Sequence, residues 1–100
     1  MKPDAARTLM RHCENVSSIL GTLAHPIRLK ILCLLSEQPL TVNSLTKSCG
    51  ISQPSMSQFL ARMKEDGLLE SNREGQKIYY NISDKRLLKL LISIKNVYCT

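Results

Sequence analysis

Residues 41–66 hold two short helical patterns joined at a glycine, and this arrangement constrains the fold more than any other feature of the chain. Thr41 is the predicted N-cap of a short helix that ends near Ser48. Gly50 suits the left-handed backbone conformation that commonly follows a helix. Ser52 is the predicted N-cap of a second, longer helix. Two short helices connected by such a turn predict a helix-turn-helix.

The second of these helices, from Gln53 to about Asp66 with Pro54 in its first turn, has one apolar and one polar face. Its apolar side is predicted to be Met56, Phe59 or Leu60, and Met63. Small polar side chains on the other side allow a close approach to DNA, where glutamine pairs with adenine and arginine with guanine. We therefore expect DNA contacts from Gln53, Ser55, Ser57, Gln58 and Arg62.

After Gly67 the apolar period changes from helical to alternating, which predicts two β-strands. The tight turn between them is Glu74-Gly75-Gln76, so the strands form a β-hairpin. A helix-turn-helix followed by such a ribbon is a winged helix. The tip of the ribbon offers three side chains for contact with the DNA backbone or minor groove: Arg73, Gln76 and Lys77.

Apolar stripes at helical spacing predict three further helices around this unit. The first extends from about Asp4 to Thr22, with the stripe Leu9, Cys13, Val16, Leu20 and Leu23. The next begins at His25-Pro26, where His25 has a helix-end role, and its core stripe is Ile27, Ile31, Leu34 and Leu35, with Arg28 and Lys30 outward. The last is capped by Ser83 or Asp84 and carries the stripe Leu87, Leu91, Ile94 and Tyr98. The predicted fold is mainly α, in the order ααααββα, as a single domain over residues 1–100.

The chain has a net charge of +6 over 100 residues, which favours an anionic partner such as nucleic acid. That charge is concentrated in residues 1–35 and 84–100, whereas residues 52–77 are neutral. No signal peptide and no membrane-spanning stretch is evident, so we expect a cytoplasmic protein without a membrane partner. Four cysteines are then expected to be thiols, and no motif for a cofactor, a metal or an enzyme active site is present.

Three stretches resemble the ArsR/SmtB family of bacterial winged-helix repressors: LAHPIRLKILCLL, SQPSMSQFLARMKEDGLL and REGQKIYY. Phe59 departs from the pattern, since the family often has histidine there. The resemblance implies a homodimer formed through the first and last helices, in which two recognition helices about one DNA turn apart read an inverted-repeat operator in double-stranded DNA.

The two common metal sites of this family are missing from the sequence. An arsenic site needs Cys-x-Cys on the first helix of the helix-turn-helix, where this chain has only Cys49. A zinc site on the last helix needs histidine, which that helix lacks.

A dithiol subgroup of the family, the BigR/SqrR/YgaV/HlyU-like regulators, is similar in two other places. It carries one cysteine in an I-L-C-x-L run and another in a terminal Y-C run, which correspond to Cys33 and Cys99 here. The resemblance implies that these thiols sense reactive sulfur species, that oxidation joins them, and that operator affinity changes as a result.

Three alternatives remain open from the sequence. One is an arsenic- or antimony-responsive repressor that uses some set of Cys13, Cys33, Cys49 and Cys99. The others are a thiol redox enzyme and a winged-helix adaptor that binds protein instead of DNA. Cys13 is predicted to lie in the core or the dimer interface, and Cys49 to have no sensor role. For Cys33, the alternative to a sensor role is a purely structural one, as a small buried hydrophobic side chain.

Overall fold

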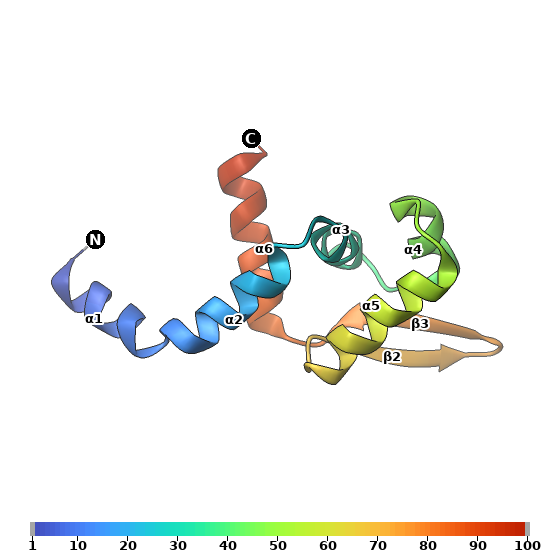
Figure 1. Cartoon of the computed structure of the whole chain (residues 1–100), viewed down its shortest axis with the longest axis horizontal. Helices are drawn as coiled ribbons and strands as arrows, with labels where there is room; N and C mark the ends of the chain where they lie inside the picture. Colours follow the sequence, from blue (N-terminus) through green and yellow to red (C-terminus); the bar gives the residue numbers. More distant parts are fainter. Residues whose placement is uncertain (1, 100) are drawn as a thin grey trace.

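The computed structural model describes residues 2–99, with six helices and three short strands (Figure 1). The helices are α1 (Pro3–Arg11), α2 (Cys13–Leu23), α3 (Pro26–Leu35), α4 (Val42–Cys49), α5 (Gln53–Glu65) and α6 (Lys85–Tyr98). The strands are β1 (Leu40–Thr41), β2 (Leu69–Glu74) and β3 (Lys77–Ile82). The predicted winged helix-turn-helix is confirmed, with α4 and α5 as the helix pair and β2–β3 as the wing.

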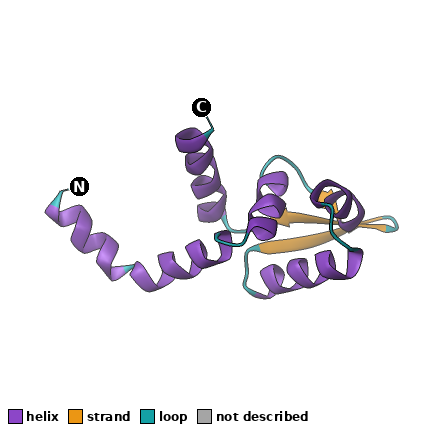
Figure 2. Cartoon of the chain, turned by 45° about the horizontal axis from the view of Figure 1, so that its top comes forward, coloured by secondary structure: helices purple, strands orange, loops and turns teal. Residues whose placement is uncertain are grey.

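The core lies where α3, α4 and α5 pack against one another and against the sheet. Predicted core side chains on α5, namely Met56, Leu60 and Met63, are fully buried. On α3, Ile31 and Leu35 are buried as predicted, and Leu32 is fully buried although the stripe did not include it. The body of the molecule is therefore the winged helix itself, with α1 and the end of α6 extending away from it (Figure 2).

The sheet has three strands in the order β1-β3-β2, all antiparallel. Leu40 and Thr41 pair with Tyr80 and Tyr79 of β3. The sequence did not predict β1, because a pair of residues after Pro39 is too short to show alternation. β1 joins the middle of β3 to the start of α4.

The prediction of one continuous first helix is wrong, because the chain breaks at His12 into α1 and α2. The amide of His12 donates to the carbonyl of Leu9 at 3.0 Å, a three-residue spacing that interrupts the α-helical pattern. No described residue of α1 is buried, so packing within the protomer does not hold the two helices in line. The apolar stripe crosses this break unchanged and gave no sign of it.

The predicted helix ends are confirmed by their capping geometry. The hydroxyls of Thr41 and Ser52 accept the amide protons of Ser44 and Ser55. Gly50 follows α4 with φ of 67°, the left-handed conformation that its position required. Of the two candidates for the N-cap of the last helix, Ser83 and Asp84, it is Asp84 whose carboxylate accepts hydrogen bonds from backbone amides of α6.

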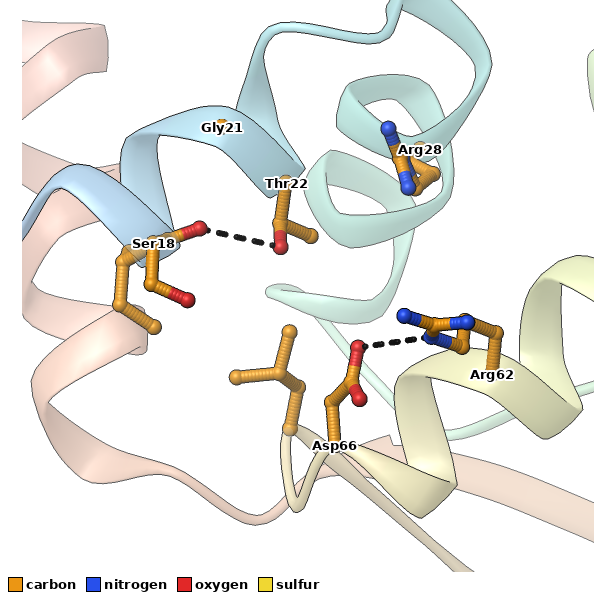
Figure 3. Close-up of a pocket in the computed structure, with 8 residues that line it drawn as sticks. Ser18, Gly21, Thr22, Arg28, Arg62 and Asp66 are labelled. Atoms are coloured by element: carbon orange, nitrogen blue, oxygen red, sulfur yellow. Dashed lines mark hydrogen bonds and ion pairs between the residues drawn. The ribbon is translucent and has the colours of Figure 1, made fainter. Parts of the chain in front are cut away.

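The expectation that Arg28 faces outward is wrong. Its side chain is partly buried between helices, and its Nε atom is shielded from solvent. Lys30, which was assigned to the same outward side, is exposed. The difference arises because α2 and the end of α5 cover the side of α3 from which Arg28 projects (Figure 3).

Among the described helices, none alone is long and apolar enough to cross a membrane. By length and composition α2 and α3 pass that test only as a pair, and they are bent by 93° at the break between them.

Candidate nucleic-acid interface and thiol pair

The outer face of α5 presents the polar side chains that the sequence assigned to DNA contact. All five of them are exposed: Gln53, Ser55, Ser57, Gln58 and Arg62. The hydroxyl of Ser52 donates to the hydroxyl of Ser55 at 3.0 Å, so Ser55 is fixed by the cap while its neighbours are free to turn. The first two turns of α5 therefore form an uncharged polar surface suited to base edges.

Arg62 lies apart from that surface. It is about 13 Å along the helix axis from Gln53, at a rise of about 1.5 Å per residue. Its Nε atom bonds to the carboxylate of Asp66 at 3.4 Å, in an exposed pair one helical turn apart. Together with Arg28, it lines a cavity next to α2. The structure thus places Arg62 with a different set of neighbours from the base-reading candidates.

The wing and the start of α4 line a second pocket of about 360 Å³. Lys77 and Gln76, which the sequence assigned to DNA, line it together with Lys47 and Asn43 of α4. Among its lining residues are two lysines and no acidic side chain. Lysines of this kind and the free amides of a helix N-terminus bind phosphate oxygens.

Sequence reasoning missed the α4 residues that line this pocket, namely Asn43, Ser44 and Lys47. No local sequence pattern marks them, because the pocket forms only when the wing lies beside α4. Arg73, the third wing candidate, is exposed on β2 opposite Ile78 and does not line the pocket.

Two of the acidic residues that make residues 52–77 neutral are already engaged. Asp66 bonds to Arg62, and Glu70 accepts a hydrogen bond from the amide of Asn81 at 2.8 Å on the strand alongside. The lysines beside α4 have no such partner among the lining residues. The charge at the wing pocket is therefore more positive than the average over this segment.

Cys33 and Cys99, which are far apart in the sequence, are coupled electrostatically in the folded chain. Cys33 is on α3, and Cys99 is the C-cap of α6. Partial burial raises the pKa of the Cys33 thiol, and the charge of a Cys99 thiolate raises that pKa further. Such an electrostatic effect acts over short distances. Both residues are exposed and both thiols are free.

The other two cysteines occupy different surroundings. Cys13 is exposed at the start of α2, with its thiol 3.4 Å from the carbonyl of Leu9, so it is not part of the core. Cys49 ends α4 and is half-buried against the core. Burial raises the pKa of Cys49, and the nearby charge of Lys30 lowers it.

The histidine at residue 25 has the helix-end role predicted for it. The Nδ1 atom of His25 accepts the amide proton of Ile27 at 3.2 Å, which caps α3. Its ring lies 5.1 Å from that of Phe59, at 57°. The departure at Phe59 therefore concerns packing between α3 and α5. Within residues 2–99, no three side chains of His, Cys, Asp or Glu are grouped so as to hold a metal ion.

Residues 25–71 match the model of the arsR family of bacterial regulatory proteins. The chain is 40% identical to the HTH-type transcriptional regulator YgaV of Escherichia coli (strain K12) over 91% of this chain and 93% of that protein. The chain belongs to the arsR family. Its structure resembles that of the transcriptional repressor BigR from Xylella fastidiosa, with a TM-score of 0.87, 29% identity and coverage of 95% and 97% of the two chains.

A second solved structure in the arsR family, reduced HlyU from Vibrio cholerae, gives a TM-score of 0.84 at 28% identity, over 94% of this chain and 99% of that one. These similarities extend over both the helix-turn-helix and the flanking helices. The protein is a DNA-binding transcriptional regulator of the winged-helix type.

Proposed function

We propose that this arsR-family protein is a homodimeric repressor that binds an inverted-repeat operator and releases it when reactive sulfur species oxidise Cys33 and Cys99. The observation that carries the proposal is the effect of a Cys99 thiolate on the pKa of Cys33, which couples the two thiols electrostatically. The similarity to the repressor BigR and to reduced HlyU supports it.

Uncovered apolar side chains support the homodimer. They lie on α1, α2 and the outer part of α6: Leu9, Met10, Val16, Leu20, Ile92, Val97 and Tyr98. Tyr98 is 82% exposed and Met10 is 72% exposed. The helices that carry these side chains extend from the body of the molecule (Figure 1). A second copy of the chain can cover them by bringing the same helices together, as in a two-fold dimer.

The polar face of α5 is proposed to read base edges in the major groove, where Gln58 lies on the exposed outer side. Lys47 and Lys77 are proposed to hold a backbone phosphate at the wing pocket. Arg73 extends the same contact along β2. In this arrangement the base contacts give sequence preference, and the lysines give affinity and register.

The sulfur chemistry balances with an organic persulfide as the oxidant. One cysteine thiolate attacks the outer sulfur of the persulfide, expels an organic thiol and becomes a protein persulfide. The other thiolate attacks the cysteine sulfur of that group, forms a disulfide and expels hydrosulfide. Two thiols are oxidised, and one sulfane sulfur is reduced to sulfide. A bridge that retains the extra sulfur requires a second persulfide to accept the electrons.

A link between these cysteines ties α6 to α3. Helix α3 packs against α2, α4 and β3, so it contacts both halves of the DNA-binding unit. Helix α6 packs on β3 near the base of the wing, and its first turns line a cavity together with α2. A covalent bridge at the far end of α6 therefore favours one position of α6 against the winged helix, and a two-state regulator can convert this into a change of DNA affinity.

The test is peptide mass spectrometry of the purified dimer before and after treatment with an organic persulfide, with operator binding measured on the same samples. We expect a Cys33–Cys99 link together with weaker binding. C33S and C99S should each abolish the response, whereas C13S serves as a matched control that keeps it. Oxidation confined to other cysteines, or a link that leaves DNA binding unchanged, contradicts the proposal.

An arsenic or antimony response is the alternative that the same variants test. Half-buried Cys49 and exposed Cys13 lie in different parts of the fold, at the end of α4 and the start of α2. Release of DNA by arsenite that depends on either of them, with Cys99 dispensable, replaces the sulfur proposal.

A further inference from the structure

A cavity of about 390 Å³ lies between α2, α3 and the end of α5. Its polar lining comes from three separate segments: Ser18 and Thr22 on α2, Arg28 on α3, and Arg62 with Asp66 on and after α5. Figure 3 shows Thr22 on one side of the cavity and the two arginines on the other. The base-reading face and the thiol pair use none of its residues except Arg62.

The side chain of Arg28 requires an acceptor that the protein does not supply. Its Nε atom is shielded from solvent, and no described residue accepts a hydrogen bond from it. Leaving a guanidinium N–H shielded from water without an acceptor is costly. An anion in the cavity would provide both the missing acceptor and a compensating charge.

The charges around the cavity favour an anion as well. Asp66 engages Arg62 through its Nε atom at 3.4 Å, which leaves the two terminal nitrogens of that guanidinium for other acceptors. The charged lining is two arginines and one aspartate, so a net positive charge remains. The hydroxyl of Thr22 donates to the carbonyl of Ser18 at 3.3 Å, a long bond from which it can turn toward a ligand.

We propose that this cavity binds a phosphate group, held by the guanidinium groups of Arg28 and Arg62 and by the hydroxyl of Thr22. Guanidinium forks match the oxygens of phosphate, which is why arginine is preferred where phosphate is recognised. The group can come from a nucleic-acid backbone or from a small phosphate-bearing molecule. The proposal is independent of the cysteine switch and can fail without affecting it.

The first experiment titrates inorganic phosphate into the full-length dimer and follows amide shifts by NMR, with chloride at equal ionic strength as the reference. Shifts should appear in α2, α3 and the end of α5. Arg28→Gln should weaken phosphate binding at least tenfold, as expected for the loss of a charged hydrogen-bonding partner. Arg7→Gln, the same substitution on exposed α1, should leave phosphate binding unchanged.

Asp66→Asn separates a binding role from a structural one. Removing the carboxylate takes a negative charge from the cavity, so phosphate should bind more tightly than to the unaltered protein. Loss of a merely structural ion pair would not strengthen binding. Arg62→Gln, at an exposed position, provides a second loss variant if Arg28→Gln does not fold.

A second experiment separates the two sources of the phosphate group. It measures operator affinity against salt concentration for the unaltered protein, Arg28→Gln and Arg7→Gln. If the backbone fills the cavity, Arg28→Gln should lower the salt slope by about one unit more than Arg7→Gln does. Phosphate binding with an unchanged slope assigns the site to a small phosphate-bearing molecule. The proposal is overturned if phosphate causes no amide shifts in α2, α3 and the end of α5. It is also overturned if Arg28→Gln and Arg62→Gln bind phosphate as well as the unaltered protein does.

Discussion

A thiolate at Cys99, the residue that ends α6, raises the pKa of Cys33 on α3, and partial burial of Cys33 has a larger effect in the same direction. Both causes disfavour the Cys33 thiolate, which is the reactive form of cysteine. Cys33 is therefore less readily ionised than an ordinary cysteine before any oxidant arrives.

Alkylation rates should reveal the raised pKa of Cys33. Because the pKa of Cys33 is raised, its rate of reaction with iodoacetamide should keep increasing at a pH where ordinary thiols, with a pKa of about 8.5, have reached their plateau. In Cys99→Ser the charge effect disappears, so the alkylation profile of Cys33 should move to lower pH. Because partial burial still raises the pKa of Cys33, its alkylation profile should remain at higher pH than that of an ordinary thiol. Peptide mass spectrometry across pH measures both profiles, and an unmoved profile in Cys99→Ser contradicts the electrostatic effect of Cys99.

The wing pocket should contribute to DNA binding without sequence preference. Lys47→Gln and Lys77→Gln should each weaken binding to all duplexes by a similar factor, and lower the salt slope by about one unit. Fluorescence anisotropy against salt concentration measures this. Lys89→Gln on α6 removes the same charge outside the interface. If it lowers the slope as much as Lys47→Gln, the pocket has no specific role.

Gln58 should affect sequence preference instead. Replacing it with alanine removes a side chain able to form two hydrogen bonds with adenine, and should reduce discrimination at one base pair by about 1–3 kcal/mol. Competition binding with single-base variants of the operator tests this. If the substitution weakens binding to all operator variants equally, Gln58 contacts the DNA backbone instead of a base.

The apolar faces of α2 and α6 should hold the dimer. Val16→Asp places a charge on a surface that the proposed dimer removes from water, so sedimentation should show a monomer at concentrations where the unaltered protein is a dimer. Ile78→Asn is the control, since Ile78 is also exposed and apolar but lies on the wing. Dimers that persist in Val16→Asp place the interface elsewhere.

Two glycines should respond in opposite directions to alanine. Gly50 has a φ of 67° with open space around it, so Gly50→Ala should cost about 1–2 kcal/mol of unfolding free energy from backbone strain alone. Gly21 lies within α2, also in open space, so Gly21→Ala should stabilise by about 0.5–1 kcal/mol. Denaturant unfolding at one fixed dimer concentration compares them.

Local patterns predicted most of the winged helix correctly. Caps such as Thr41 and Ser52, the turn at Gly50 and the alternation after Gly67 act over a few residues, so the sequence displays them directly. What it did not display depends on distant partners. The break at His12 leaves the apolar stripe intact, and β1 exists only because β3 returns beside it.

The candidate site shows the same division. The exposed face of α5 follows from helical spacing, whereas the placement of Lys47 beside Lys77 requires the wing to lie against α4. Arg28 was assigned outward because its own helix gave no information about α2 and α5. The electrostatic coupling of Cys33 and Cys99 likewise depends on where α6 ends, which spacing along the chain does not determine.

The short pairing of Leu40 and Thr41 with β3 has a consequence for the operator. Since Thr41 also caps α4, the sheet of the wing and the start of the helix-turn-helix share one residue. The ribbon is therefore tied to the start of α4, and we expect each protomer to span a constant length of duplex. Operators of this protein should then tolerate changes of base far better than insertion of a single base pair within a half-site.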